Sequence, residues 1–250
     1  MAISLKSVGS WLDLTSTTTV SIPASPAAGD RMILLATWKD YAETISTPAG
    51  WTAIGSVYAD GTVGTGNGTG SMSVHAWYRD WQSGDSNPTL SGFFGIDGGA
   101  AVIQLWQKAS GETWDTPLTS NGPWTFLSAQ TVSALASLTV PNGAVVIGLL
   151  GLADNVTTIT RGTADLSGSG ITWNGDYVES PATHHDSGAS DSAGADAGYR
   201  LVTTGATTTL GLEALLSTAE TGAVKFIVQS VSGGGGGGSS GSSGNFFLFI

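Results

Sequence analysis

Short apolar runs rich in Val, Ile, Thr and Trp, each bounded by Gly, Pro, Asn, Asp or Ser, dominate the hydrophobic pattern of this chain. Apolar residues at the helical spacing i, i+3, i+4, i+7 do not persist over three turns, so the pattern favours strands. The expected strands are residues 2–8, 17–22, 31–39, 51–58, 72–80, 88–92, 100–108, 130–140, 144–152, 171–178, 194–202, 207–212 and 222–231.

Many short strands at regular spacing predict an all-β fold of the sandwich type. The connectors agree, because Pro and Gly concentrate between the runs, where they suit turns and strand ends. Residues 23–30 form one such connector, and residues 61–70 form a Gly/Thr/Asn-rich hairpin tip.

The two series of strands resemble one unit used twice. Residues 29–36 resemble 143–150, residues 76–79 resemble 197–200, and residues 99–106 resemble 222–229. Ordered matches at a nearly constant offset indicate duplication. The sequence therefore predicts tandem jelly-roll-like or immunoglobulin-like β-sandwiches, with one large two-sheet sandwich built from both halves as the alternative. The expected division is a first repeat over 1–122, a second over 123–232, a linker over 233–244 and an anchor over 245–250.

Composition narrows the function. The chain has 250 residues, 8 Lys+Arg against 19 Asp+Glu, a net charge of −11 and no Cys. Nucleic-acid binding requires a basic surface, which so few cations do not supply. The start of the chain lacks a signal-peptide pattern, and residues 144–153, the longest apolar run, are about half the length of a membrane span. We expect neither a nucleic-acid nor a membrane partner.

The C-terminal segment breaks the strand pattern. Residues 233–238 are all Gly, a Gly/Ser stretch follows to residue 244, and the chain ends in an apolar tip. Such a tip on a Gly/Ser tether is an aggregation hazard unless another surface receives it. We expect it to bind a partner or a neighbouring copy, with folding back onto its own body as the alternative. The tip residues assigned to partner binding are Phe246, Phe247, Leu248, Phe249 and Ile250.

Four segments of the first half carry a family resemblance. They are the Thr-rich segment 17–22, Pro-x-x-Gly-Asp followed by an apolar run at 26–35, Thr-Pro-Ala-Gly-Trp-Thr at 47–52, and a run ending in Tyr-Arg at 74–79. Together they resemble a group of tailed-bacteriophage virion proteins. The resemblance implies a β-sandwich part of a head, tail or fibre, ending in a Gly/Ser-rich stretch with an apolar tip. It covers residues 1–108 well and the remainder loosely.

Two of these features have a structural interpretation that needs no ligand. In Pro-Ala-Gly-Trp, Pro48 fixes φ, Gly50 permits a turn, and Trp51 then enters a strand where its ring caps the sandwich. Arg79 and Arg200 occupy matched repeat positions. We expect each to bond strand-end carbonyls or a nearby Asp within its own repeat.

Catalytic and metal-binding patterns are weak. His184-His185-Asp186, with Asp191 and Asp196 following, is the candidate metal cluster. Adjacent His residues on an extended segment point to opposite sides, so the pair does not suit one ion. No phosphate loop, nucleophile motif or carboxylate pair in a sugar cleft stands out. We expect no enzymatic activity, no cofactor and no resident metal.

Tryptophan is the remaining signal, because eight of the nine Trp residues occur by position 124. Trp38, Trp77 and Trp106 fall within expected strands, and we expect their side chains to lie in the hydrophobic core. Trp81, Trp114 and Trp124 fall near strand ends or loops and are assigned to partner binding. Packing between repeats or subunits is favoured over stacking on sugar rings.

The sequence thus predicts a non-enzymatic structural component of a tailed-phage virion. The first choice is a capsid decoration or head-surface protein anchored by its C-terminal tip, and the alternatives are a tail or fibre component or a carbohydrate-binding module for host adsorption. The expected partners are other virion proteins, such as the major capsid protein, and copies of the chain in a trimer or lattice; a host glycan is the alternative. The expected location is the particle surface, after synthesis in the host cytoplasm.

Overall fold

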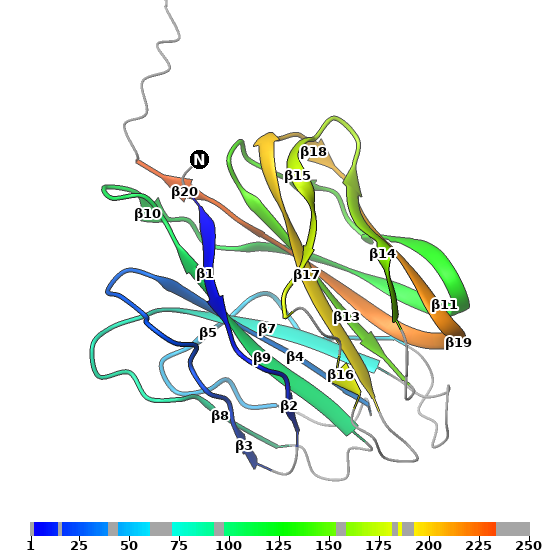
Figure 1. Ribbon diagram of the computed structural model, residues 1–250, viewed down its shortest axis with the longest axis horizontal. Coiled ribbons are helices and arrows are strands. Elements are labelled where there is room, and N and C mark those ends of the chain that lie inside the picture. The colour runs from blue at the N-terminus through cyan, green and yellow to red at the C-terminus, as the bar shows by residue number, and fades with distance from the viewer. Residues whose placement is uncertain are drawn as a thin grey trace, which may run out of the picture.

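A computed structural model describes residues 3–14, 17–39, 45–60, 72–92, 98–153, 159–181, 185–186 and 193–233. Every regular element in these ranges is a β-strand, and every strand pair is antiparallel (Figure 1). The all-β prediction is confirmed, while the choice between jelly-roll and immunoglobulin type stays a prediction.

The first half forms a seven-stranded sheet in the order β1-β9-β4-β7-β5, with β2 beside β9 and β6 beside β7. Its strands are β1 (Ser4–Val8), β2 (Leu12–Asp13), β4 (Arg31–Lys39), β5 (Thr52–Ala53), β6 (Tyr58–Asp60), β7 (Met72–Asp80) and β9 (Gly98–Gln107).

The second half repeats this arrangement as β11-β19-β13-β17-β15, with β14 beside β19 and β16 beside β17. Its strands are β11 (Leu118–Ser133), β13 (Val145–Leu152), β14 (Ile159–Gly168), β15 (Thr172–Glu179), β16 (His185–Asp186), β17 (Gly194–Thr204) and β19 (Leu210–Gln229).

Three two-stranded ladders complete the fold. In the first half β3 (Thr17–Thr19) pairs with β8 (Thr89–Ser91), and in the second half β12 (Leu138–Thr139) pairs with β18 (Thr207–Thr208). The third ladder joins the halves: β10 (Thr113–Trp114) pairs with β20 (Val231–Ser232), so the strand after β9 meets the strand after β19.

The register of the central strands is the same in both halves. Arg31 lies opposite Asp80 on one side and Trp106 on the other. At the matched place, Val145 lies opposite Leu201 and Gln229. The segments that resemble one another in sequence therefore occupy equivalent positions in the two sheets.

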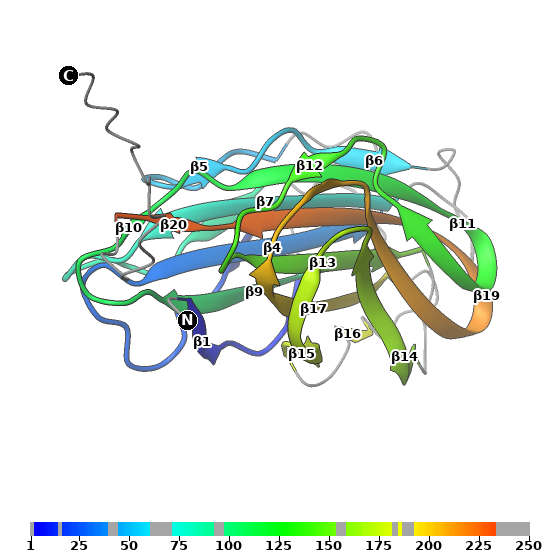
Figure 2. The ribbon, with the colours of Figure 1, turned by 90° about the horizontal axis from the view of Figure 1, so that it is seen from above.

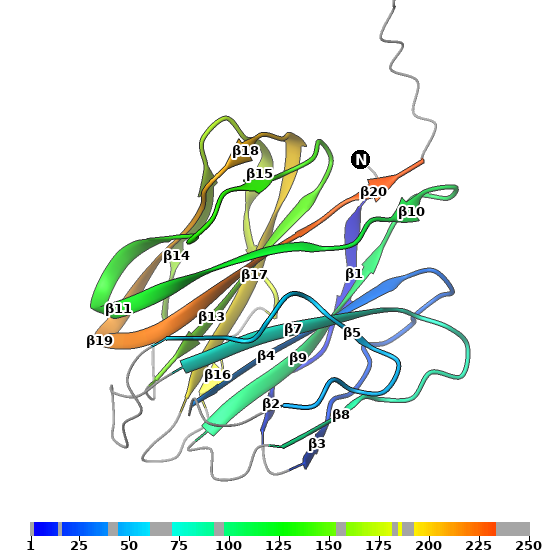
Figure 3. The same ribbon diagram turned by 180° about the vertical axis from the view of Figure 1, so that it is seen from behind.

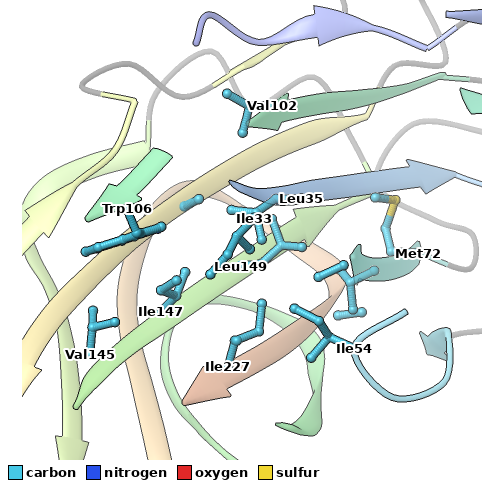
Figure 4. Packing of buried hydrophobic residues seen from close by; sticks show 14 of the residues in the cluster. Ile33, Leu35, Ile54, Met72, Val102, Trp106, Val145, Ile147, Leu149 and Ile227 are labelled. Atoms are coloured by element: carbon cyan, nitrogen blue, oxygen red, sulfur yellow. The ribbon is translucent and has the colours of Figure 1, made fainter. Parts of the chain in front are cut away.

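Buried side chains form three clusters because the buried central strands place alternate residues on opposite faces. The central cluster lies between the two sheets and draws on both, with Leu35 and Val102 from the first and Leu149 and Ile227 from the second (Figure 4). The outer face of the first sheet packs around Trp38 and Trp77, and that of the second around Phe226. The sheets therefore share a core, and each also has an outer one.

The pair β11 and β19 differs most from expectation. The sequence predicted separate strands over 207–212 and 222–231 and a connector before residue 130, whereas β19 is continuous and β11 begins at Leu118. Pro123, which reads as a strand breaker, is tolerated because β11 is an edge strand of its sheet, where a missing N–H costs no ladder bond. The two strands curve away together at one end (Figures 2 and 3). The residue 122–123 boundary falls inside β11.

Candidate functional site at the junction of the two sheets

Arg31 sits where the two sheets meet near β10 and β20, and its side chain is buried. Its guanidinium forms a two-pronged ion pair with Asp80, with Nε donating to Oδ1 at 2.7 Å and an Nη donating to Oδ2 at 3.2 Å. The other Nη donates to the Asp115 carbonyl at 2.5 Å and to Gln229 Oε1 at 2.8 Å. One side chain of the first sheet thus bonds β19 of the second.

Aromatic rings enclose this guanidinium. It lies 4.5 Å from the ring centroid of Tyr78 and 5.2 Å from that of Trp114. Both distances are within the range of cation–π attraction. Trp114 is only 8% exposed, and its indole N–H donates to the Gly29 carbonyl at 2.8 Å. Trp114 therefore packs between the halves.

Asp115, Gln229 and Ser230 extend the junction to the start of the C-terminal segment. Gln229 is fully buried and donates from Nε2 to the Asp115 carbonyl at 3.0 Å and the Ser230 carbonyl at 2.7 Å. Ser230 Oγ donates to Asp115 Oδ2 at 2.7 Å, and the Asp115 amide donates to the Ser230 carbonyl at 3.1 Å. Immediately beyond, β20 pairs with β10. The chain is thus fixed to both sheets up to Ser232.

A second polar contact between the halves is centred on Lys225 in β19. Lys225 is 0% exposed, and its Nζ donates to the Ser56 carbonyl of the first half at 3.0 Å and to Asn121 Oδ1 of β11 at 3.2 Å. Burial lowers the pKa of Lys225 from 10.5 to about 8. Burial first, and then the Lys225 charge, lower the pKa of His75 from 6.5 to about 3. His75 is therefore neutral at ordinary pH, and its Nδ1 is buried without a hydrogen-bond partner among the described residues.

Two further polar contacts join the halves. Gln104 Nε2 donates to the Ser180 carbonyl at 2.8 Å, and the Trp106 indole donates to Gln104 Oε1 at 3.2 Å. At the other end of the sheets, His185 Nε2 lies 2.8 Å from Asp13 Oδ1. Specific polar bonds therefore fix how the two sheets align, in addition to their shared apolar core.

The Pro-Ala-Gly-Trp segment is a tight turn at the edge of the first sheet. The Trp51 amide donates to the Pro48 carbonyl at 3.0 Å, and Gly50 has a φ of +78°, as a type II turn requires. Trp51 is 7% exposed and belongs to the outer core of the first half. The turn predicted from the motif is confirmed, and Trp51, buried in that outer core, comes immediately before β5.

Arg79 holds this turn from the adjoining strand. Its Nη donates to the Ala49 carbonyl at 3.3 Å, and its guanidinium pairs with Asp85. In the second half Arg200 donates to Asp165 Oδ1 at 2.6 Å and to the carbonyls of Leu166 and Gly175 at 2.9 and 3.0 Å. Both matched arginines thus bond a carbonyl and an Asp of their own half, as the sequence predicted.

Two shallow clefts flank Arg79. One, of about 350 Å³, is lined by Trp51, Arg79 and Asp85 together with residues 86–89, which lead into β8. The other, of about 290 Å³, is lined by Thr52, Arg79 and Asp80 among others. Their walls carry mostly polar groups, so they suit a small polar ligand better than an apolar one.

The sequence-assigned partner residues do not gather at one place among the described residues. Trp81 is half-buried against the outer core of the first half, and Trp114 is at the junction. Trp124 lies in β11 opposite Gly222, and nothing is described of its side chain. The tip residues 245–250 lie outside the described residues, as do His184 and Asp191 of the candidate metal cluster. The partner assignments stay predictions.

The sequence reasoning missed Arg31, Lys225, Gln229 and Gln104 as contacts between the halves. Gln104 and Lys225 interrupt apolar runs, and Arg31 and Gln229 stand at the ends of such runs within buried strands. That interruption was the available signal, because a polar side chain in a buried strand requires a partner of its own.

Comparison of the chain with protein-family models, with curated proteins and with solved structures finds no match in any of the three. Within the described ranges, no helix long and apolar enough to cross a membrane is found. Across the same residues, no group of three or more His, Asp or Glu is placed to hold a metal ion.

Proposed function

We propose that this protein is a non-enzymatic structural component of a tailed-phage virion, with a capsid decoration or head-surface role as first choice. In this proposal the double-sheet body faces outward, and the C-terminal tip (residues 245–250) binds a neighbouring virion protein or another copy of the chain. The observation that carries the proposal is the attachment of the chain at Ser232 to both sheets.

An anchor holds a body only if the strand that leads to it is itself firmly held. Here β20 pairs with β10, and Gln229 and Ser230 bond Asp115 one step earlier. Arg31, in β4 of the first sheet, bonds Gln229 and the Asp115 carbonyl, and its ion pair with Asp80 holds it to β7. A force applied at Ser232 would therefore be distributed over both sheets and would not act on the β19–β20 segment alone.

The sequence of the tip suits insertion into an apolar groove. Its Phe, Leu and Ile side chains contribute about 1.5–3 kcal/mol each when fully buried, before ordering costs are subtracted. Twelve residues over 233–244 reach at most about 40 Å when fully extended. The receiving surface must therefore lie within that distance of the junction.

The test compares the assembly state of three forms of the chain by sedimentation velocity. They are the full chain, a chain ending at Gly244, and a full-length chain in which Phe246, Phe247 and Phe249 are replaced by Ser. We expect the full chain to form oligomers or to bind purified capsids of the phage that encodes it, and both altered forms to remain monomeric and unbound. Equal assembly and equal capsid binding by all three forms would contradict the anchor.

A tail or fibre role uses the same anchor at a different place on the particle. Gold-labelled antibody against the body, viewed on intact phage by electron microscopy, separates the two. Label over the head supports a decoration role, and label confined to the tail supports the alternative.

The clefts beside Arg79 favour glycan binding as the second candidate function. Trp51, which is 7% exposed, lines this cleft beside polar groups from Arg79 and Asp85. A glycan in the cleft would change tryptophan fluorescence, and Arg79→Met would abolish the change while Arg200→Met would keep it. No response across a broad glycan panel would contradict this function.

A further inference from the structure

We propose that Lys225 and Asn121 form an intramolecular isopeptide bond that joins β19 to β11. The inference rests on the placement of a buried amine against a side-chain carboxamide. It is independent of the proposed virion role, because it concerns covalent chemistry within the body alone.

The register brings the two side chains together. Asn121 and Lys225 are direct cross-strand partners in the antiparallel pair of β11 and β19. Lys225 Nζ lies 3.2 Å from Asn121 Oδ1, which places the amine next to the carboxamide carbon. The Ser56 carbonyl accepts a second hydrogen bond from Nζ at 3.0 Å and so limits its movement. Reactants held in this way react as an intramolecular pair with a high effective concentration.

Burial favours formation of the amide bond by lowering the protonation of Lys225. An ammonium group that is held by neutral oxygens in a protein core has a high free energy. Burial therefore shifts the protonation equilibrium of this lysine towards the neutral amine, compared with a lysine in water. The lowered pKa of Lys225, about 8, gives a reactive unprotonated fraction near neutral pH. Neighbouring His75 is itself neutral because its pKa is about 3, so it adds no positive charge.

The reaction balances without a further reagent. The lone pair of Lys225 Nζ attacks Cγ of Asn121, and Oδ1 takes the negative charge of the tetrahedral intermediate. A proton passes from Nζ to Nδ2, the Cγ–Nδ2 bond breaks, and ammonia leaves. The product is a neutral secondary amide in place of a buried cation, with no change in oxidation state.

The bond would close a loop of about a hundred residues, which lowers the entropy of the unfolded chain. It would also tie β19, the strand that leads to the junction with β10, to its neighbour. A cross-link there resists separation of the two strands even where the hydrogen bonds of the edge strand open.

The test is the intact mass of the purified full-length chain after denaturation, followed by tandem mass spectrometry of its peptides. We expect a mass about 17 Da below that of the sequence, which corresponds to one ammonia lost. A succinimide at Asn121-Gly122 would lose the same mass. A branched peptide containing both Asn121 and Lys225 is therefore the required finding.

Two pairs of variants sharpen the test. Lys225→Met and Asn121→Ala should restore the full mass, whereas Lys108→Met and Asn174→Ala should keep the loss. Asn174 is a matched control because, like Asn121, it precedes a Gly.

The wild-type chain alone decides the question if a variant fails to fold. The proposal would be overturned if the chain still had the full mass of its sequence, with no ammonia lost, after prolonged incubation near pH 9, which is above the Lys225 pKa of about 8. A linear peptide that carries the loss on Asn121 alone would also overturn it.

Discussion

The two halves have the same strand order and register but pack their outer faces with different side chains. The first half fills its outer core with Trp38, Trp51 and Trp77. The buried outer core of the second half is aliphatic around Phe226, with partly buried Trp173 and Tyr177 packed against it. The same topology therefore tolerates very different outer packing. The common register of the central strands, rather than the chemistry of the outer core, defines the architecture.

At the face shared by the two sheets, the halves differ in a complementary way. Arg31 in the first half corresponds in register to Val145, and Trp106 corresponds to Gln229. In the first pair the polar residue is Arg31, in the first half, and in the second pair it is Gln229, in the second half. An Nη of Arg31 therefore donates to Gln229 Oε1 across the interface at 2.8 Å. Two identical halves would place either two arginines or none at this point. The difference between the halves thus creates the bond that joins them.

The largest effect should come from Leu149→Ala, which removes packing from the shared core through the second half. We expect a loss of about 2–5 kcal/mol in the free energy of unfolding. Seven of the nine Trp residues precede β11, so tryptophan fluorescence reports mainly on the first half and its junction with the second. In this variant the urea midpoint measured by fluorescence should shift by as much as the midpoint measured by circular dichroism. An unchanged fluorescence midpoint would show that the halves unfold separately.

Arg31→Met should have the next largest effect, a loss of about 2–4 kcal/mol, because it leaves the buried Gln229 side-chain oxygen without its Arg31 donor and Asp80 without its ion-pair partner. The Asp115 carbonyl loses one of its two donors and keeps Gln229 Nε2. Arg200→Met is the control. It removes bonds within the second half but none between the halves. The comparison is made by urea denaturation, and an equal loss in both variants would refute a special role for the junction.

Strands β4 and β7 of the first half could be predicted closely from the sequence, because both are buried apolar runs between clear turn signals. The single strand expected over 51–58 is instead two short strands, β5 and β6. The second half was harder. Pro123 marks a break in most strands and is permitted in β11 only by its edge position, which no local pattern reveals. The polar junction was missed because the partners of Arg31 lie 84 and 198 residues away.

His75 makes stability depend on pH. Its pKa is about 3 in the folded protein and near 6.5 when unfolded, so the unfolded chain binds more protons between those values. Stability is therefore full above pH 6.5 and falls with acidification, by about 2 kcal/mol between pH 6.5 and pH 5. His75→Leu should flatten this part of the profile measured by thermal unfolding. The same slope in the variant would assign the acid sensitivity to other groups.

The smallest expected effect is a difference in stability cost between alanine substitutions at two glycines, each of which lies beside one of the matched arginines. Gly50 and Gly175 both have positive φ, +78° and +89°. A Cβ on Gly50 would clash with the Arg79 guanidinium, whereas one on Gly175 meets nothing within 4 Å. We expect Gly175→Ala to cost about 1 kcal/mol from backbone strain alone. Gly50→Ala should cost about 1 kcal/mol more. Equal costs in thermal unfolding would mean that Arg79 does not brace the turn.

The central claim is that two sheets of matched register share one core and behave as one body. Hydrogen exchange followed by mass spectrometry under native conditions tests it most directly, with peptides from β4 and β13 as reporters of the two sheets. If the claim is right, the slowest amides of both strands exchange with the same opening free energy, and Leu149→Ala lowers both equally. Opening of β13 while β4 stays protected would contradict it and make the halves separate domains.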